Sequence, residues 1–249
     1  TGFPADPNNY HWMLLALVVT AIGGSLIKPS VVGTVARTTT EDTKALGYSI
    51  YYTLVNIGGF VGPYIALAVR ENVGISYVLV VSSLTSLVLF AATTIFYREP
   101  ARPRDAPPPK SMGRVLAEML LVFGNLRFVS FLVIFSGFWA MFWHVFYALP
   151  FYVKDYLRYS RFEVIETVDA LTIIIVTVPA TALAKRLKPL SAMVLGFVLA
   201  TCCWFVMGSV PTLAGAVVAL VLFAIGEAIQ SPRFYEYVAN LAPPDQVGT

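Results

Sequence analysis

The sequence predicts an all-α membrane protein, and three observations support this fold class. Hydrophobic residues make up 57% of the chain and charged residues 12%, whereas ordinary soluble domains carry roughly 25% charged residues. The apolar residues gather in runs long enough to cross a bilayer, for which an α-helix needs about 20 residues. Runs such as VLVVSSLTSLVLFAATTIF are apolar on every side, whereas the strands of a membrane β-barrel alternate in polarity over about ten residues.

Apolar runs account for nearly the whole chain. The sequence starts without an initiator methionine or a signal peptide and ends in a loop, so we expect it to be an internal fragment. We expect membrane helices over residues 12–35, 48–69, 77–97, 129–153, 167–185, 190–210 and 212–239.

The third and fourth runs are separated by a long linker. Its first part, REPARPRDAPPPK, is rich in proline, which is typical of an extended and solvated segment. Its second part, SMGRVLAEMLLVFGNLRF, concentrates apolar residues on one side and predicts an interfacial helix. The predicted organisation is therefore three membrane helices of an N-terminal bundle in 1–97, the linker in 98–128, and four membrane helices of a C-terminal bundle in 129–249.

The loops carry an uneven positive charge, which predicts the orientation of the chain. Eleven lysines and arginines fall in one set of alternate loops, which includes the linker 98–128, and four fall in the other set. Cytoplasmic loops retain positive charge, so we expect a cytoplasmic linker and residue 1 outside, in the plasma (inner) membrane. The net charge of +3 comes mostly from these loops, so we expect a lipid bilayer as partner and no nucleic acid.

The stretch GGSLIKPSVVG places a charge and a helix breaker inside the first run. Lys28 lies nine residues before Arg37, about 13 Å along a helix, which is too far for easy access to the cytoplasmic face. Pro29 removes a backbone hydrogen bond, and Gly24 one turn earlier lets the helix bend and a neighbour approach. An ionisable residue inside a membrane marks a functional site by default. Lys28 is therefore a candidate binding or coupling residue, with a buried structural lysine as the alternative.

The stretch AIGEAIQSPRFYEY carries the second candidate. Glu227 follows a long run without another ionisable residue, and Pro232 repeats the interruption that Pro29 makes. Burial of a carboxyl group favours its neutral form, so Glu227 is suited to bind and release a proton. The alternative is a structural glutamate that is hydrogen-bonded to neighbouring helices.

The second run carries a polar stripe. Tyr48, Tyr52 and Asn56 are spaced by four residues and so share one helical face, followed by Gly59 and Pro63. Such a face suits a water-filled cavity that binds a polar ligand. Tyrosines near membrane ends also serve as interface anchors, which would account for Tyr48 but not for the deeper Asn56.

The fourth run contains a histidine among aromatic residues, in FSGFWAMFWHVFYALPFYVKDY. His144 in mid-span is suited to relay protons. It is equally well explained as a packing residue. We include His144 and its neighbour Trp143 among the candidate substrate-binding residues, together with Lys28, Tyr52 and Asn56.

Four stretches give the chain a resemblance to the proton-dependent oligopeptide transporter family of the major facilitator superfamily. GGSLIKPSVVGTVAR resembles that family's fourth helix, whose Lys-Pro element matches Lys28 and Pro29, and GYSIYYTLVNIGGFVGP resembles the fifth-helix signature, with its Asn at Asn56. FWAMFWH resembles the seventh helix, and GEAIQSPRFYEYVANLAPP resembles the tenth, with its Glu at Glu227. The resemblance implies the superfamily's helical bundles, with seven of an expected twelve membrane helices, the fourth to the tenth, in this chain.

The resemblance also implies roles for individual residues. Lys28 would take part in proton coupling and help to hold a peptide carboxylate, Asn56 would contact the peptide backbone, and Glu227 would belong to the proton and gate network. The acid of the family's seventh helix falls on Trp143 here, which weakens the expected grip on a peptide amino group. Gate or hinge roles are assigned to small and helix-breaking residues, which are Gly24, Pro29, Gly59, Pro63 and Pro232.

These features favour a secondary active transporter: a proton-coupled symporter of small peptides, such as di- or tripeptides, that works by alternating access around a midplane site. The proton would be the coupling ion, and no other cofactor is expected. The alternatives are a transporter for another small solute, such as a drug-like compound, a sugar or an organic anion, and a non-transporting receptor, which would not need a titrating Glu227. An enzyme is not expected, because the spans hold no nucleophile with a base at sensible spacing and no HExxH motif.

Cys202 and Cys203 are adjacent in one span, where a disulfide is geometrically poor and a metal site lacks further ligands.

Overall fold

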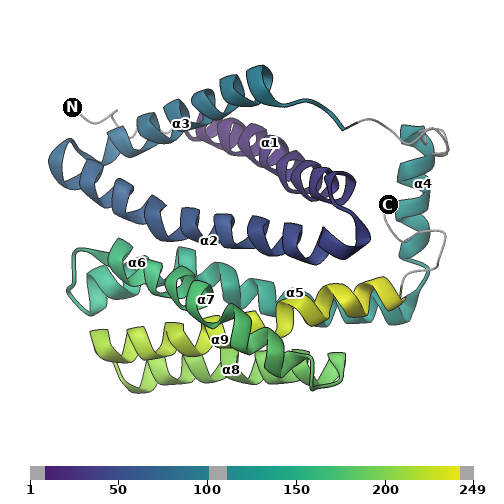
Figure 1. Cartoon of the computed structure of the whole chain (residues 1–249). Helices are drawn as coiled ribbons and strands as arrows, with labels where there is room; N and C mark the ends of the chain where they lie inside the picture. The colour runs from purple at the N-terminus through teal and green to yellow at the C-terminus, as the bar shows by residue number, and fades with distance from the viewer. Residues whose placement is uncertain (1–8, 101–110, 242–249) are drawn as a thin grey trace. The chain divides into compact units, whose positions relative to one another are not determined.

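The computed structural model describes residues 9–100 and 111–241, and within them the all-α fold is confirmed (Figure 1). Seven of its helical stretches are long and apolar enough to cross a membrane, as the sequence predicts. The helices are α1 (Asn9–Thr38), α2 (Glu41–Asn72), α3 (Ile75–Phe96), α4 (Met112–Val122), α5 (Leu126–Tyr147), α6 (Leu149–Phe151), α7 (Phe162–Ala184), α8 (Pro189–Ser209) and α9 (Leu213–Leu241), with a π-helical turn η1 (Tyr152–Tyr156) after α6.

The chain divides into two compact units, which we describe separately. Unit 1 comprises residues 1–55 and 68–106, and unit 2 comprises residues 56–67 and 107–249. Unit 2 therefore contains α4 to α9 together with the middle of α2. The boundaries of the two predicted bundles, at residues 97 and 129, stay a prediction.

Local sequence explains where several helices begin. Thr40 caps α2, since its side chain and that of Thr43 form a reciprocal capping box. Asn125 caps α5 by accepting a hydrogen bond from the backbone N–H of Phe128 at 3.2 Å. Pro189 is the first residue of α8, a position where its missing N–H costs nothing.

The turn between α2 and α3 depends on a glycine. Gly74 has a φ of 125°, a conformation that residues with a Cβ rarely adopt. Its N–H donates to the carbonyl of Val69, which closes the end of α2. Two membrane helices are thereby joined by a very short connection.

The membrane stretch that starts at Leu126 changes its helical geometry near its far end. Pro150 has no N–H to donate, and α5 ends three residues before it. The chain continues through α6 into η1, where the N–H of Leu157 donates to the carbonyl of Tyr152 at 2.9 Å. The Tyr152 hydroxyl donates to the carbonyl of Met207 at 2.7 Å, which ties this segment to the end of α8.

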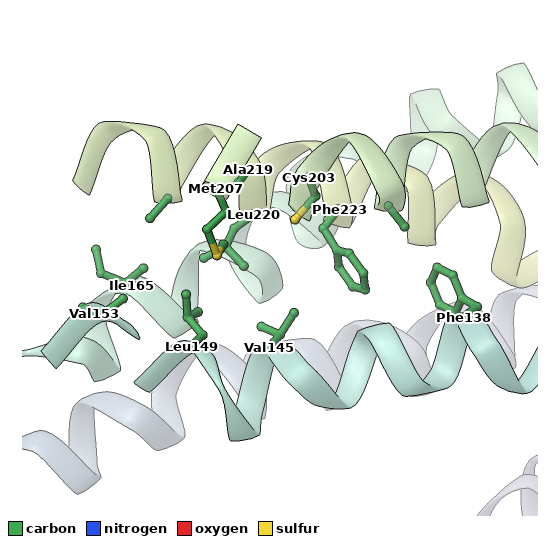
Figure 2. Close-up of a cluster of buried hydrophobic side chains, with 12 residues drawn as sticks. Phe138, Val145, Leu149, Val153, Ile165, Cys203, Met207, Ala219, Leu220 and Phe223 are labelled. Carbon is green, nitrogen blue, oxygen red and sulfur yellow. The ribbon is translucent and has the colours of Figure 1, made fainter. Parts of the chain in front are cut away.

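Unit 2 has an apolar core in which α9 packs mainly against α8 and also against α7. In Figure 2, Phe138, Val145 and Leu149 from α5 and α6 point towards side chains of α8 and α9. The buried members of this cluster are Phe138, Val145, Leu149, Val153, Ile165, Ala200, Cys203, Met207, Ala216, Ala219, Leu220 and Phe223. A second, smaller cluster joins the other ends of α7 and α9 and consists of Ala180, Ala184, Ala192, Ala228 and Ile229.

Two glycines let α8 and α9 cross at close range. A Cβ added at Gly196 would lie 2.7 Å from the Cβ of Gln230 and 2.7 Å from the carbonyl oxygen of Gly226. A Cβ added at Gly226 would lie 2.8 Å from the carbonyl oxygen of Gly196. Small residues at such crossings allow membrane helices to gain van der Waals contact, and here the contact fixes the position of the α9 turn that carries Glu227.

Candidate functional site

Unit 2 encloses a set of polar side chains within its apolar core. Burying a polar group in a membrane protein is costly unless it is hydrogen-bonded, and ionisable groups in such positions are commonly functional. Three structural elements supply these groups. The buried polar residues are Asn56 from α2, Glu163, Thr167, Asp169 and Thr172 from α7, and Glu227 and Gln230 from α9.

Glu227 lies in the most enclosed turn of α9. Its side chain is 8% exposed, and each residue from 226 to 230 is buried. Gly226 before it contacts α8, and Ala228 after it packs in the cluster that contains Ala180 and Ala184 of α7. The membrane stretch Leu213–Ser231 contains no lysine or arginine, and Glu227 is its one acid.

Gln230 lies one turn after Glu227 and is fully buried. Neither atom of its amide group has a hydrogen-bond partner in the part of the chain that the structure describes. Its Cβ packs against Gly196 of α8. A buried amide in this state costs stability, which suggests that the residue is present for another reason than packing.

Asp169 is a buried acid that the sequence analysis did not single out. Its side chain is 5% exposed, and its Oδ1 has no hydrogen-bond partner among the described residues. The carboxyl lies close enough to the buried thiol of Cys203 on α8 to interact with it electrostatically. A recognisable signal was present, because Glu163, Glu166 and Asp169 recur every three residues at the start of one apolar run. The run was predicted to begin at residue 167, whereas α7 begins at Phe162 and contains all three acids.

Arg233 fixes the end of α9 to the neighbouring helix. Its guanidinium donates to the carbonyl of Ala184 through Nε at 2.9 Å and through Nη2 at 2.7 Å, and also to the carbonyl of Leu187 at 3.2 Å. The last carbonyls of a helix have no partner within the helix. Arg233 therefore caps the C-terminus of α7 and stabilises the α7–α9 contact below Glu227.

The two predicted residues of α5 lie side by side in sequence but in different surroundings. Trp143 is 49% exposed and stacks on Tyr147, with ring centroids 5.8 Å apart. Nδ1 of His144 donates to the carbonyl of Ala140 at 2.7 Å, since a carbonyl only accepts. The His144 ring meets the edge of Trp204 on α8 at 6.3 Å.

The other predicted residues fall partly in unit 1. Gly24, Pro29 and Tyr52 belong to unit 1, where α1 continues as one helix through Pro29. Lys28 also belongs to that helix, and its side chain lies outside the described residues, as does that of Pro232 in α9.

The predicted residues of the middle of α2 belong to unit 2. Asn56 is 9% exposed. One turn further on, a Cβ added at Gly59 would lie 3.5 Å from the Cβ of Ala170 on α7. Pro63 lies inside α2, which continues through it as one helix. Asn56, Glu227, Trp143 and His144 thus all belong to unit 2, where Asn56 and Glu227 are buried and Trp143 and His144 are exposed, and the predicted roles of these residues stay predictions.

An apolar groove of about 410 Å³ lies between α5 and α8. It contains no charged side chain, so it does not suit the charged ends of a peptide. Its walls suit lipid tails or the apolar side chains of another helix. The lining residues are Phe131, Ile134, Phe135, Leu190, Met193, Val194, Phe197, Val198, Thr201 and Cys202.

Comparison with known proteins agrees with this architecture. A protein-family model described as the Major Facilitator Superfamily matches the chain over residues 1–249. No curated protein and no solved structure matched the chain. The match covers the whole chain, and the structure has seven apolar helices of membrane-spanning length. This chain therefore belongs to the major facilitator superfamily, whose members are multi-pass membrane transporters of small molecules.

Proposed function

We propose that the protein is a proton-coupled symporter of small peptides that works by alternating access. The observation that carries the proposal is Glu227, a carboxyl group enclosed in the core of unit 2 on a membrane stretch without lysine or arginine. In an apolar environment the protonated, neutral form of a carboxyl group is lower in free energy than the charged form. Proton binding from one side of the membrane and release to the other would then drive transport.

Three further residues are proposed to hold the substrate. Lys28 supplies the one basic group inside the predicted spans of the N-terminal bundle, and its charge suits a peptide carboxylate. Asn56 supplies an amide that matches the peptide backbone in hydrogen-bonding capacity. Tyr52, four residues earlier on the same helix face, adds a hydroxyl.

A second candidate substrate class is favoured by Trp143. The half-exposed indole and the stacked ring of Tyr147 offer an aromatic surface at the position where the resemblance expects an acid. Aromatic faces bind apolar and aromatic solutes and hold no ammonium group by ion pairing. A transporter of an aromatic, drug-like solute is therefore the alternative cargo on the same fold.

The test is uptake of a labelled dipeptide by the purified protein in proteoliposomes, with and without an inward proton gradient. We expect gradient-driven uptake that disappears in Glu227→Gln and in Lys28→Ala. Glu99→Gln is the matched control, because Glu99 is an exposed carboxylate in unit 1. Uptake of an aromatic solute without uptake of any dipeptide would favour the alternative cargo, and unchanged gradient-driven uptake in Glu227→Gln would contradict the coupling role.

A further inference from the structure

We propose that Asp169 is a second proton-binding residue of unit 2, which receives its proton from the predicted outer face of the membrane along Glu163 and Glu166. The proposal rests on the proposed function only in taking the proton as the coupling ion. Nothing in the resemblance or in the family match assigns a role to this position. Its support comes from burial, from the lack of lysine and arginine in the membrane stretches of α7, α8 and α9, and from the position of three acids along α7.

Asp169 is positioned to hold a proton because its surroundings do not support a charge. Asp169 is only 5% exposed to solvent, and its Oδ1 has no hydrogen-bond partner in residues 9–100 and 111–241. The neighbouring Cys203 thiol is 0% exposed and is only a weak donor. An isolated carboxylate in an apolar interior is far more costly than the neutral acid.

Among the described residues, the membrane stretches of α7, α8 and α9 carry no cationic side chain at the level of Asp169. The membrane stretches Phe162–Ala184, Pro189–Ser209 and Leu213–Ser231 contain no lysine or arginine. Lys154 in η1 is exposed. Besides Asp169, the titratable and charged groups in the membrane stretches of unit 2 are Glu163 and Glu166 of α7, Cys202 and Cys203 of α8, Glu227 of α9, Arg127, His144 and Tyr147 of α5, Tyr64 of α2, and Tyr152, Lys154, Asp155 and Tyr156 of η1. Arg233 of α9 lies beyond them and donates to the carbonyl at the end of α7.

The three acids follow one another along the first turns of α7, with Glu163 and Asp169 buried and Glu166 partly exposed. Residues three apart on a helix are neighbours on its surface, so Glu163 adjoins Glu166, and Glu166 adjoins Asp169. The carboxyl groups of Glu163 and Glu166 are close enough to interact electrostatically. Glu163 lies in the first turn of α7, two residues after the exposed Arg161. The path covers about 9 Å along the axis, and chains of acids at such spacing are what intramembrane proton relays use.

Asp169 and Glu227 lie at different levels along the α7–α9 pair. Ile165, one turn before Asp169, belongs to the larger core cluster with Ala216 near the start of α9. Ala228, next to Glu227, packs with Ala180 and Ala184 near the end of α7. On the predicted orientation the start of α7 lies outside. A proton entering from there would reach Asp169 before it reaches the level of Glu227.

A proton fits this site better than a metal cation does. A metal ion needs several oxygen, nitrogen or sulfur ligands together. The described residues contain no group of three or more His, Cys, Asp or Glu side chains arranged to hold one. The nearby Thr172 hydroxyl donates to the carbonyl of Val168 at 2.7 Å, so it is already engaged within its own helix. One unpartnered carboxyl oxygen is sufficient for a proton.

The first test is pH-difference infrared spectroscopy of the purified protein in lipid nanodiscs, which reads the C=O stretch of protonated carboxyl groups. We expect a component typical of a protonated carboxyl in an apolar site, lost in Asp169→Asn. Asp155→Asn is the matched control and keeps that component, since Asp155 is exposed in η1. Identical spectra for the wild-type protein and Asp169→Asn would overturn the proposal.

A second measurement covers the case in which Asp169→Asn does not fold. A hydrophobic carbodiimide modifies carboxyl groups that are protonated in apolar surroundings, and mass spectrometry locates the modified residue. In the wild-type protein we expect modification at Asp169 that declines at alkaline pH, and none at Asp155. Absence of modification at Asp169 at every pH, while another buried acid is modified, would overturn the proposal.

A transport measurement separates this proposal from the proposed function. We expect Asp169→Asn in proteoliposomes to lose proton-driven accumulation of the labelled dipeptide and to keep exchange of internal for external dipeptide. Wild-type accumulation by Asp169→Asn would overturn the role of Asp169. If the wild-type protein transports no dipeptide while the infrared component still depends on Asp169, the proposed cargo fails and the proton site stands.

Discussion

The membrane helices of the two units are similarly apolar, yet they are buried to very different extents. The mean hydropathy of the spans is 1.8, 1.4 and 2.1 for α1 to α3, and 2.1 for the stretch Leu213–Ser231 of α9. None of the most apolar window is buried in α1 or α3, which lie wholly in unit 1, whereas 61% is buried in the α9 stretch of unit 2. Apolarity therefore places these helices in a membrane, and it does not by itself make them pack on one another.

The crossing of α8 and α9 in unit 2 is lined by small residues. In unit 2, Gly196 and Gly226 let α8 and α9 approach, and the smaller core cluster consists mostly of alanines. In unit 1, a Cβ at Gly23, Gly24 or Gly33 of α1 would meet nothing within 4 Å among the described residues. Helix association in lipid depends on close van der Waals contact rather than on removal of apolar surface from water. Unit 1 has a close glycine contact of its own at Gly47 of α2, which packs against Val35 of α1, but the buried acids lie in unit 2, beside the α8–α9 crossing.

The largest effect is expected where the two units differ most. Gly196→Leu would force its side chain into Gln230 and into the Gly226 carbonyl, so we expect a loss of about 3 kcal/mol of stability and a much reduced yield of folded protein. Gly33→Leu in α1 is the matched control and should leave folding unchanged. Fluorescence-detected size-exclusion chromatography after heating measures the folded fraction and the melting temperature of both variants. A folded Gly196→Leu protein with a wild-type melting temperature would contradict the claim that the α8–α9 crossing requires a glycine at this position.

A smaller effect is expected from the two arginines that lie near helix ends. Arg233→Gln removes charge-assisted hydrogen bonds to the carbonyls that end α7, at a cost of about 1.5–3 kcal/mol. Arg37→Gln in unit 1 removes an exposed ion pair to Glu99 at 3.5 Å, which is worth less than about 1 kcal/mol. Chemical unfolding of the two variants in the same detergent gives the difference. Equal destabilisation would contradict the assignment of Arg233 as a cap.

The smallest effect on stability is expected at Gln230, where a substitution should separate stability from transport. Gln230→Leu replaces a buried amide that has no described hydrogen-bond partner, so we expect unchanged or higher stability, by up to about 2 kcal/mol. Transport should nevertheless fall, because the polar group next to Glu227 is lost. Thr20→Val in α1 is the control, since the Thr20 hydroxyl donates only to the carbonyl of Ala16 in its own helix. A strongly destabilised Gln230→Leu protein would show that the amide has a structural partner.

The sequence was sufficient for the fold class and for the seven membrane helices, because both follow from composition and from the length of apolar runs. It was less exact at helix ends. The fifth run was expected to begin at residue 167, and the extra turn that begins α7 at Phe162 brings Glu163 and Glu166 into the helix. Charged residues at the start of a membrane helix lower the local apolarity, so a hydropathy pattern places them in the loop.

The burial of individual acids was harder to predict, because it depends on helix partners that sequence spacing does not specify. Glu227 was singled out since it interrupts a long apolar run, and the structure places it in a buried turn. Asp169 was not, although it is as well buried, because its enclosure depends on Cys203 of α8 and on α9. The roles predicted for Lys28 and Tyr52 rest on the sequence and on the resemblance.

The most direct test of the central claim, that a buried carboxyl in unit 2 couples protons to solute transport, is the internal pH of proteoliposomes loaded with a pH-sensitive dye. A dipeptide is added outside in the absence of any imposed gradient, with a potassium ionophore to dissipate the membrane potential. We predict that the interior acidifies with the wild-type protein and with Glu99→Gln, and that it does not with Glu227→Gln. Uptake of the dipeptide without any change in internal pH, or equal acidification by Glu227→Gln, would contradict the account.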